Sequence, residues 1–195
     1  MAATELTSRR WRRRATRRWL PAGLARIWLH AHAGVWLATL AASALVAVIG
    51  RPLTLPTRRL LGLALSAQRN PPPQVAHGLA LAAHNIPIAA WPLLLGVLGA
   101  HRHRLATHVA DAVLLAGIVV NTLPVGAALG AYGTAVLAYI PQLPLEWGGL
   151  ALGASGWLVQ RRRALTASEG IGVFVLIACV LLCAAVLETV AVPHR

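Results

Sequence analysis

The chain has 195 residues and a formal net charge of +13, and 57% of its residues are hydrophobic. This share exceeds the apolar content of about 45–50% that is usual in soluble domains. The composition therefore excludes an ordinary soluble enzyme and indicates a protein with several membrane-spanning segments. All 18 basic residues are arginines, because the sequence contains no lysine.

The N-terminal residues 1–26 are rich in arginine and tryptophan. Eight arginines fall between Arg9 and Arg26, and Trp11, Trp19 and Trp28 interleave with the run, which suits an interfacial helix. Such a run suits either nucleic-acid binding or a cytoplasmic tail that contacts anionic lipid headgroups. Because the run directly precedes an apolar segment, we favour the cytoplasmic tail and predict no nucleic-acid partner.

Five apolar segments follow, each long enough to cross about 30 Å of hydrocarbon as a helix. They comprise residues 27–50, 75–100, 105–131, 135–160 and 170–193. We therefore predict an all-α fold, a polytopic membrane bundle of about five transmembrane helices, with residues 27–195 forming a single transmembrane domain. Membrane lipids are its first expected partners, and the cell membrane is its expected location.

The segment 51–74 is too polar to cross the membrane. Four leucines between residues 60 and 65 predict a short amphipathic helix within 53–67 that lies in the membrane interface. A run of three prolines, 71–73, ends this helix and leads into the next span.

The distribution of arginine predicts the orientation of the chain. With the N-terminus in the cytoplasm, the cytoplasmic segments carry thirteen arginines: eight in the tail, two at 102–104 and three at 161–163. The outer segments carry five, of which four lie in 51–74. This excess agrees with the positive-inside rule, and the four outer arginines are its exception.

Prolines occur inside three of the expected spans. They are Pro87 and Pro92 in the second, Pro124 in the third, and Pro141 with Pro144 in the fourth. Proline frees a backbone carbonyl, which must find another partner when the helix lies in lipid. We therefore expect these helices to be interrupted and the interruptions to face the interior of the bundle.

Two pairs of glycines have the spacing of helix–helix contacts. Gly126 and Gly130 belong to the third span, and Gly149 and Gly153 to the fourth. Small residues four positions apart let two helix backbones approach closely in a membrane. We predict that both pairs lie where helices pack tightly.

Glu146 and Glu188 lie within the last two apolar segments, although the chain has only five acidic residues. A carboxylate at membrane depth costs about 2.5–3.5 kcal/mol, so each must face a protein interior or a watery cavity. At about 1.5 Å per residue along the expected helices, His84, Asn85 and Asn121 share the outer half of the bilayer with these glutamates. The sequence therefore predicts a polar pocket formed by four helices.

Two interpretations of this pocket remain open. It is either a buried acid–base site or a hydrogen-bonded cluster that holds the bundle together, with each bond contributing about 0.6–2 kcal/mol. Under the first interpretation, the candidate catalytic residues are Glu146, Glu188 and His84. The candidate substrate-binding residues are Asn85, Asn121, Gln142 and Tyr139.

The other histidines do not have the spacing of a metal site. His30 and His32 are two residues apart, as are His101 and His103, which places their rings on different sides of a helix. The zinc motif HExxH is absent from the sequence. We predict no metal ion and no cofactor.

Two pairs of residues lie within one helical turn of each other. His108 and Asp111 are three positions apart, and we expect them to form a local pair near Arg104. Cys179 and Cys183 are four apart on one helix face, where the geometry is poor for a disulfide. We expect both cysteines to act as small apolar packing residues.

Four short motifs occur in order between residues 83 and 193. They are His84-Asn85, Asn121 followed by Gly126 and Gly130, Glu146 in LEWGGLALGASGWLV, and the closing CAAVLETVAVP. With these motifs the chain resembles the stage II sporulation protein M family of integral membrane proteins. That family carries paired amides where this chain has His84-Asn85, and a His-Gly pair where it has Gln142-Leu143-Pro144.

The resemblance implies a five-helix membrane protein that works in a multi-protein assembly, with a second protein subunit as its partner. Proteins of this type also accompany peptide natural-product pathways, including the linaridin type, where a membrane subunit and a soluble partner epimerise residues. Three functions follow as alternatives. The first is a membrane subunit of a hetero-complex that acts on a hydrophobic peptide or a cell-envelope substrate. The second is a cofactor-independent peptide epimerase or isomerase, and the third a small transporter or channel component.

Overall fold

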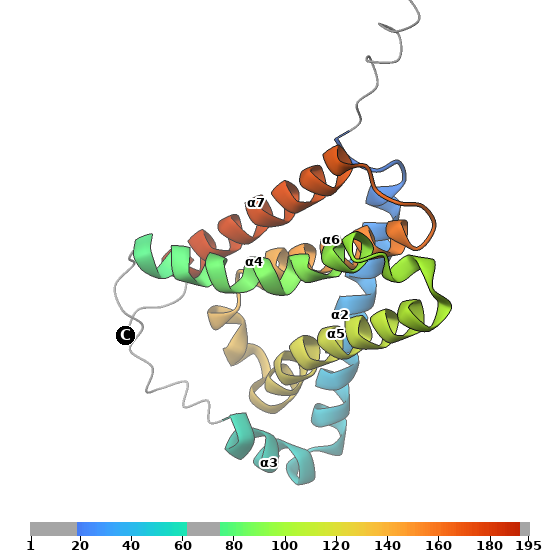
Figure 1. Cartoon of the computed structure of the whole chain (residues 1–195). Coiled ribbons are helices and arrows are strands. Elements are labelled where there is room, and N and C mark those ends of the chain that lie inside the picture. Colours follow the sequence, from blue (N-terminus) through green and yellow to red (C-terminus); the bar gives the residue numbers. More distant parts are fainter. Residues whose placement is uncertain (1–18, 62–74, 192–195) are drawn as a thin grey trace, which may run out of the picture.

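The computed structural model describes residues 19–61 and 75–191, and within them it contains helices and no strand (Figure 1). The α-helices are α2 (Leu24–Ile49), α3 (Arg51–Leu61), α4 (Val75–Val97), α5 (Arg104–Tyr132), α6 (Leu143–Gln160) and α7 (Ala167–Ala191). Two 3-10 segments, η1 (Ala100–Arg102) and η2 (Gly133–Tyr139), join them. The prediction of an all-α helical bundle is confirmed. Most of the N-terminal tail, the prolines 71–73 and the last four residues lie outside the described ranges.

Within residues 19–61 and 75–191, four stretches are long and apolar enough to cross a membrane, namely α2, α4, α5 extended through η2 to Ala138, and α7. The fourth expected span, 135–160, is divided instead. Its first residues belong to η2, and α6 begins only at Leu143, after Pro141. Of the 18 residues of α6, 14 are buried, so this helix is the centre of the bundle rather than a lipid-facing span.

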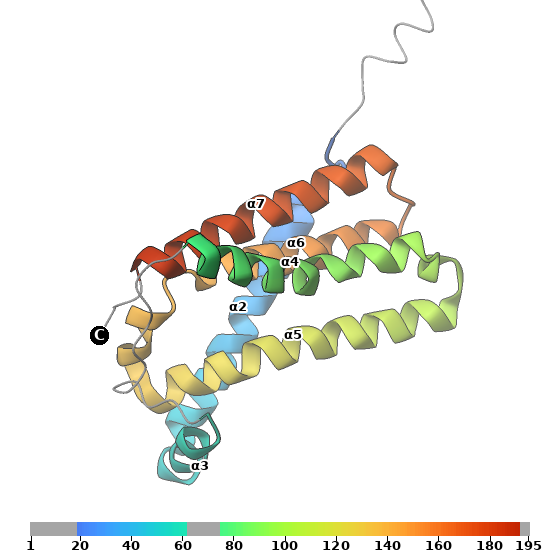
Figure 2. The same ribbon diagram turned by 60° about the vertical axis from the view of Figure 1, so that its left-hand side comes forward.

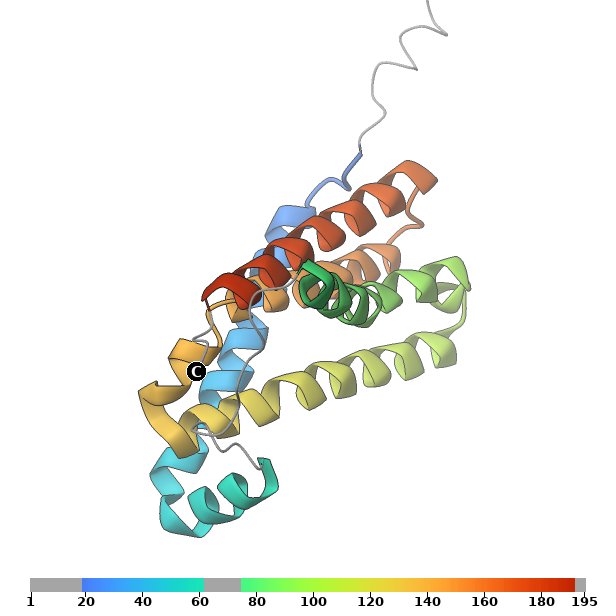
Figure 3. The ribbon, with the colours of Figure 1, turned by 90° about the vertical axis from the view of Figure 1, so that its left-hand side faces the viewer.

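Three helices pack directly against α6. It contacts α4 and α7 along one side and α2 on the other, while α2 also packs along α5. Figure 2 shows α4 and α6 between α7 and α5, with α2 crossing them. In Figure 3, α3 extends past the C-terminal end of α2, on the side of the molecule away from α7.

The contact between α2 and α5 depends on glycine. A Cβ atom at Gly126 would lie 2.5 Å from the carbonyl oxygen of Thr39, and one at Gly130 would overlap the carbonyl oxygen of Ser43. The two glycines therefore let the α5 backbone rest directly on the α2 backbone. This confirms the close packing predicted for the first glycine pair.

The second glycine pair places α6 between two neighbours. A Cβ atom at Gly149 would lie 2.9 Å from Cδ2 of Leu181 on α7. One at Gly153 would overlap the carbonyl oxygen of Ala89 on α4. Because small residues face both neighbours, α6 is buried on two sides at once, and the second packing prediction is also confirmed.

The prediction of interrupted helices is wrong for α4 and α5, which continue through their prolines. Pro92 is buried in the bundle, whereas Pro87 and Pro124 are exposed. A proline removes only one hydrogen bond, and the remaining bonds of a long helix in a packed bundle hold the helical path. Only Pro141 coincides with a break, where η2 has ended and α6 has not yet begun.

The amphipathic segment after α2 forms a helix, α3, over Arg51–Leu61, while the rest of the predicted 53–67 lies outside the described residues. Arg58 donates from Nε and Nη2 to the carbonyl oxygen of Ala131, at 3.0 and 2.6 Å. Its guanidinium also lies 5.0 Å from the ring centroid of Tyr132. Arg58 therefore caps the C-terminal end of α5, where a positive charge is favourable. This contact accounts for one of the four arginines in 51–74 that are exceptions to the positive-inside rule.

The start of α7 is held by a reciprocal cap. The backbone N–H of Thr166 donates to Glu169 Oε2 at 3.0 Å, and the N–H of Glu169 donates to Thr166 Oγ1 at 3.2 Å. Arg163 adds two hydrogen bonds to the same carboxylate, at 2.8 and 2.7 Å. The hydrogen bonds with Glu169 raise the pKa of the Arg163 guanidinium above its ordinary value. The sequence Thr-x-x-Glu is the signal for this capping box.

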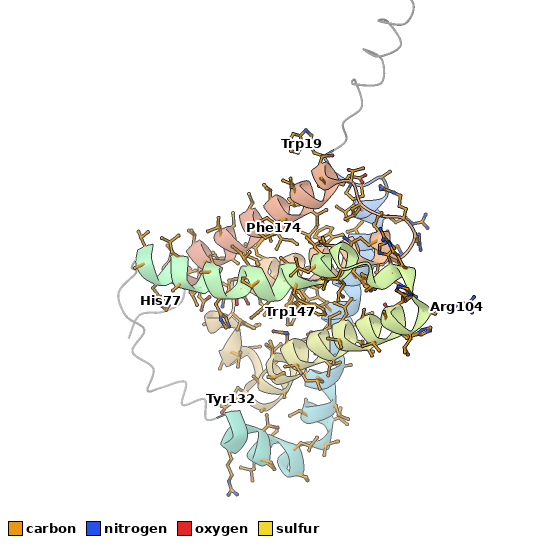
Figure 4. All side chains as sticks on the ribbon, viewed as in Figure 1. Trp19, His77, Arg104, Tyr132, Trp147 and Phe174 are labelled. Carbon is orange, nitrogen blue, oxygen red and sulfur yellow. The ribbon has the colours of Figure 1, made fainter. Side chains whose placement is uncertain are left out.

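The arginine-rich connections lie at one end of the bundle. The α4–α5 connection carries Arg102 and Arg104, and the α6–α7 connection carries residues 161–163. Figure 4 shows Arg104 at this end and His77 at the opposite end, near the start of α4. The expected orientation would place the arginine-rich end in the cytoplasm.

Cysteine labelling tests that orientation. In a chain carrying Cys179→Ala and Cys183→Ala, a membrane-impermeant maleimide is expected to label Thr134→Cys in intact cells. Thr134 is exposed in η2, at the opposite end from Arg104. Ser8→Cys is expected to react only after the cells are permeabilised. Labelling of Ser8→Cys in intact cells would reverse the orientation.

Candidate functional site

A small cavity of about 140 Å³ lies where α4, α5, α6 and α7 meet. Its polar lining comes from Asn85 of α4, Asn121 of α5 and Glu146 of α6. Apolar walls include Trp147 and Leu181, and Figure 4 shows Trp147 in the middle of the bundle. Three of the predicted site residues, each from a different helix, are therefore brought to one cavity.

Glu146 is positioned by the beginning of α6. It lies in the first turn of this helix, where the helix dipole favours a negative charge. Asn85 Nδ2 donates a hydrogen bond of 3.3 Å to Glu146 Oε1. The restart of the helix after Pro141 therefore determines where the carboxyl group enters the cavity, and the α4 amide determines how it is oriented.

Asn121 contributes an acceptor to the cavity. Its Nδ2 donates to the backbone carbonyl of Gly117 on the same helix, at 2.7 Å. That bond uses one of the two N–H donors of the amide and leaves the carbonyl oxygen for another donor. The cavity thus combines an acceptor on α5 with a carboxyl group on α6.

Glu188 is not among the residues that line the cavity. It is half-buried on α7 and close enough to Glu146 for the two carboxyl groups to interact electrostatically. His77, in the first turn of α4, is also near enough to Glu188 for an electrostatic interaction, but this one is favourable, whereas two carboxylates repel each other. The sequence reasoning missed His77, because a histidine at the very start of an apolar segment looks like an ordinary interfacial residue.

The other predicted site residues are placed differently. His84 is exposed and does not line the cavity, although its neighbour Asn85 does. Gln142 is 7% exposed, just before α6, and its Oε1 has no hydrogen-bond partner. The cavity lining does not include it. Tyr139 ends η2, and its side chain lies outside the described part of the structure.

An aromatic layer from α2 supports the cavity wall. Trp36 and Trp147 form an edge-to-face pair with ring centroids 4.6 Å apart. Trp36 Nε1 donates to His32 Nε2 at 3.0 Å, so this ring carries its hydrogen on Nδ1, which is buried without a partner. Trp28 stacks on the other side of His32 and donates to the carbonyl oxygen of Gly148 at 3.0 Å. The spacing of Trp28, His32 and Trp36, four residues apart, is the signal that could have revealed this layer.

The expected local pair of His108 and Asp111 is wrong. His108 Nδ1 bonds to the carbonyl oxygen of Arg104 at 2.7 Å. Asp111 instead accepts a hydrogen bond of 2.9 Å from Trp157 Nε1 and pairs with Arg161 at 3.3 Å. Because the C-terminal half of α6 packs against the start of α5, cross-helix donors reach this carboxylate and the local histidine does not.

The prediction that the two cysteines act as small packing residues is wrong. Cys179 and Cys183 are free and exposed on α7. Within the described residues, no three His, Cys, Asp or Glu side chains are grouped closely enough to hold a metal ion. The chain was compared with protein-family models, curated proteins and solved structures, and none of them matches it.

The chemistry available in the cavity is that of amides and carboxyl groups. Glu146 can accept a hydrogen bond or, when protonated, donate one, and Asn121 can accept one. A polar group of a ligand would therefore find partners of both kinds. Glu188 adds a second carboxyl group, near enough to Glu146 for an electrostatic interaction.

Proposed function

We propose that the protein is a membrane-embedded subunit of a hetero-complex that binds a polar group of a peptide or cell-envelope substrate. The observation that carries this proposal is the convergence of Asn85, Asn121 and Glu146 from three helices on one cavity. Asn85 and Glu146 are bonded to each other, and in a cluster that only held the bundle together Asn121 would be bonded to them as well. Here the Asn121 side chain bonds only to its own helix, which leaves its oxygen for a ligand.

The volume of the cavity limits the size of the group that can bind in it. Pockets for whole small molecules measure about 300–1,000 Å³, whereas this one measures about 140 Å³. It therefore fits one side chain or one backbone unit of a larger molecule. A peptide or envelope precursor lying along the bundle would insert a single polar group, with Trp147 and Leu181 around it.

The resemblance to the stage II sporulation protein M family supports the assembly part of the proposal. Members of such assemblies contribute a membrane site while a partner carries further steps. The partner would meet the substrate at the end of the bundle where α6 begins, because Glu146 lies in the first turn of that helix. Co-purification from cells in mild detergent would reveal a stoichiometric second chain, and a lone, fully active monomer would contradict the assembly.

A second function is favoured by the pairing of Glu146 with Glu188. Glu146 lines the cavity, and Glu188 is near enough to interact with it electrostatically, so two carboxyl groups are available to give and to take a proton. That arrangement suits a cofactor-independent peptide epimerase or isomerase of the linaridin type, in which a base removes a Cα proton and an acid returns one. Because His84 is exposed away from the cavity, Glu188 takes the role of the second acid in this mechanism.

Site-directed photocrosslinking tests the binding function. A diazirine amino acid at Ile88, which lines the cavity, is expected to capture a peptide or an envelope precursor in living cells. The capture is expected to fall about tenfold in Glu146→Gln, consistent with the loss of a charged hydrogen bond. The same probe at Leu115, which is 62% exposed on α5, is the matched control and is expected to capture lipid. Capture of lipid alone at both positions would contradict the proposal.

Solvent deuterium distinguishes the two functions. If the complex epimerises a peptide, the product formed in D₂O will carry deuterium at the Cα of the changed residue. Glu146→Gln and Glu188→Gln are each expected to abolish this incorporation while the protein still folds and binds its partner, because glutamine keeps the shape but cannot ionise. Unchanged incorporation in the double variant would exclude the acid–base mechanism and leave the binding function alone.

A further inference from the structure

A second, larger hollow of about 680 Å³ lies at the arginine-rich end of the bundle, between α4 and α7. The two helices touch near the start of α4, where a Cβ at Gly78 would lie 3.4 Å from Thr189. Figure 1 shows them spreading apart toward the other end. Phe174 lies between them in Figure 4, on the wall of the hollow. This hollow is a groove with the C-terminal half of α4 on one side and the first turns of α7 on the other.

The walls of the groove are almost entirely apolar. Trp91, Leu94, Val97 and Phe174 line its length. On α4 the lining runs from Ile86 to Val97, which is about 16 Å at 1.5 Å per residue. The volume falls in the range of about 300–1,000 Å³ that ligand pockets occupy. These dimensions suit an extended hydrocarbon chain lying along the helices.

One end of the groove carries a polar atom that has no hydrogen-bond partner. Gln160, the last residue of α6, lines the groove and is 5% exposed. Its Nε2 donates to the carbonyl oxygen of Leu93 at 3.3 Å, but its Oε1 has no hydrogen-bond partner. A buried acceptor without a donor is costly, so an occupant that brings an O–H or N–H group to this point would be favoured.

The same end carries positive charge. Arg102 and Arg162 are exposed next to the groove-lining His101 and the loop that follows Gln160. Of the neighbouring arginines, Arg161 pairs with Asp111 and Arg163 with Glu169. The charge at the mouth of the groove therefore remains positive after these ion pairs are counted, and it suits a phosphate group.

We propose that the groove binds one phospholipid with an anionic headgroup that bears hydroxyl groups, as phosphatidylglycerol does. An acyl chain would lie between α4 and α7, a headgroup hydroxyl would donate to Gln160 Oε1, and the phosphate would lie near Arg102 and Arg162. Basic pockets between membrane helices bind anionic lipids in this manner. The site is separate from the Glu146 cavity, and the inference does not depend on the proposed function.

The test is lipid binding to the full chain in detergent, measured by native mass spectrometry with phosphatidylglycerol or phosphatidylcholine added. One molecule of phosphatidylglycerol is expected to bind at least tenfold more tightly than phosphatidylcholine. Arg102→Ala and Arg162→Ala are each expected to weaken it about fivefold, the contribution of one arginine near a charged surface. Arg59→Ala, an exposed arginine on α3, is the control and is expected to have no effect.

Filling the groove gives a second, independent measurement. A side chain added at Gly170, on the groove wall, would meet open space, and the same is true of Gly34 on α2. Gly170→Phe is expected to abolish binding of the single lipid, whereas Gly34→Phe is expected to retain it. If Gly170→Phe is not recovered folded, Gly170→Leu takes its place.

The hydroxyl contact is tested separately. Gln160→Leu is expected to remove most of the preference for phosphatidylglycerol over an anionic lipid without headgroup hydroxyls, such as a phosphatidic acid methyl ester. Equal binding of phosphatidylglycerol and phosphatidylcholine by the unmodified chain would overturn the inference. Unchanged binding in both Gly170 variants would do the same, because the bound lipid would then lie outside the groove.

Discussion

Replacing Gly153 with alanine is expected to lower the free energy of unfolding by about 1–3 kcal/mol or more, the cost of overpacking a tight core. The added Cβ would overlap the carbonyl oxygen of Ala89, which is backbone and cannot rotate away. To accommodate it, α6 and α4 would have to move apart along their whole contact. The measurement is thermal unfolding of the purified protein in one detergent.

Gly148→Ala is the matched control, five residues earlier on the same helix. A Cβ there would meet its nearest neighbours at 3.8–3.9 Å, which is ordinary van der Waals contact. This variant is expected to be as stable as the original chain or more so by up to about 1 kcal/mol, since alanine favours the helix over glycine. Equal stability of Gly148→Ala and Gly153→Ala would show that α4 and α6 are not in close contact.

Asp111→Leu is expected to have the next largest effect on stability. Trp157 is 0% exposed, and its Nε1 donates to Asp111, so the substitution leaves a buried N–H without an acceptor. Such a group costs about 1–3 kcal/mol. Arg161 loses its partner as well, although this partly exposed ion pair contributes less to stability than the buried hydrogen bond does.

Asp111→Asn separates the hydrogen bond from the charge. The amide oxygen can still accept a hydrogen bond from Trp157, so this variant is expected to keep most of the stability that Asp111→Leu loses. His108→Leu is the control, because His108 is exposed and bonds only to its own helix. If Asp111→Leu melts at the same temperature as the unmodified chain, the Asp111–Trp157 bond does not hold α5 to α6.

Much of the fold follows from patterns that act along one helix. Long apolar segments predict helices, and glycines four apart predict close contact, which Gly126 and Gly130 make with α2. The role of α6 does not follow from such patterns. The segment 135–160 is as long as a span, and only the positions of the neighbouring helices show that α6, within it, is largely buried. The prolines inside α4 and α5 also mislead a prediction from sequence, since both helices continue through them.

The candidate site was partly predictable for a geometric reason. Counting residues from the helix ends gives depth, and depth brought Asn85, Asn121 and Glu146 to a common level. Depth does not determine the direction in which a side chain points around the helix axis, and adjacent helical positions point about 100° apart. His84 and Asn85 therefore have the same depth, yet only Asn85 reaches the cavity. A uniformly apolar helix carries no stripe that would reveal which side faces inward.

The burial of α6 has a consequence for how the chain enters the membrane. The glycines of α6, Pro144 near its start and Glu146 disfavour its direct partitioning into lipid, and it is not one of the four stretches of the described residues that are apolar enough to span. During synthesis α2, α4 and α5 are made before it, and α7 is made after it. The earlier helices must therefore offer α6 a protein surface while the ribosome is still translating. Substitutions on the faces of α2 and α4 that receive α6 should then reduce its integration even where the finished protein would tolerate them.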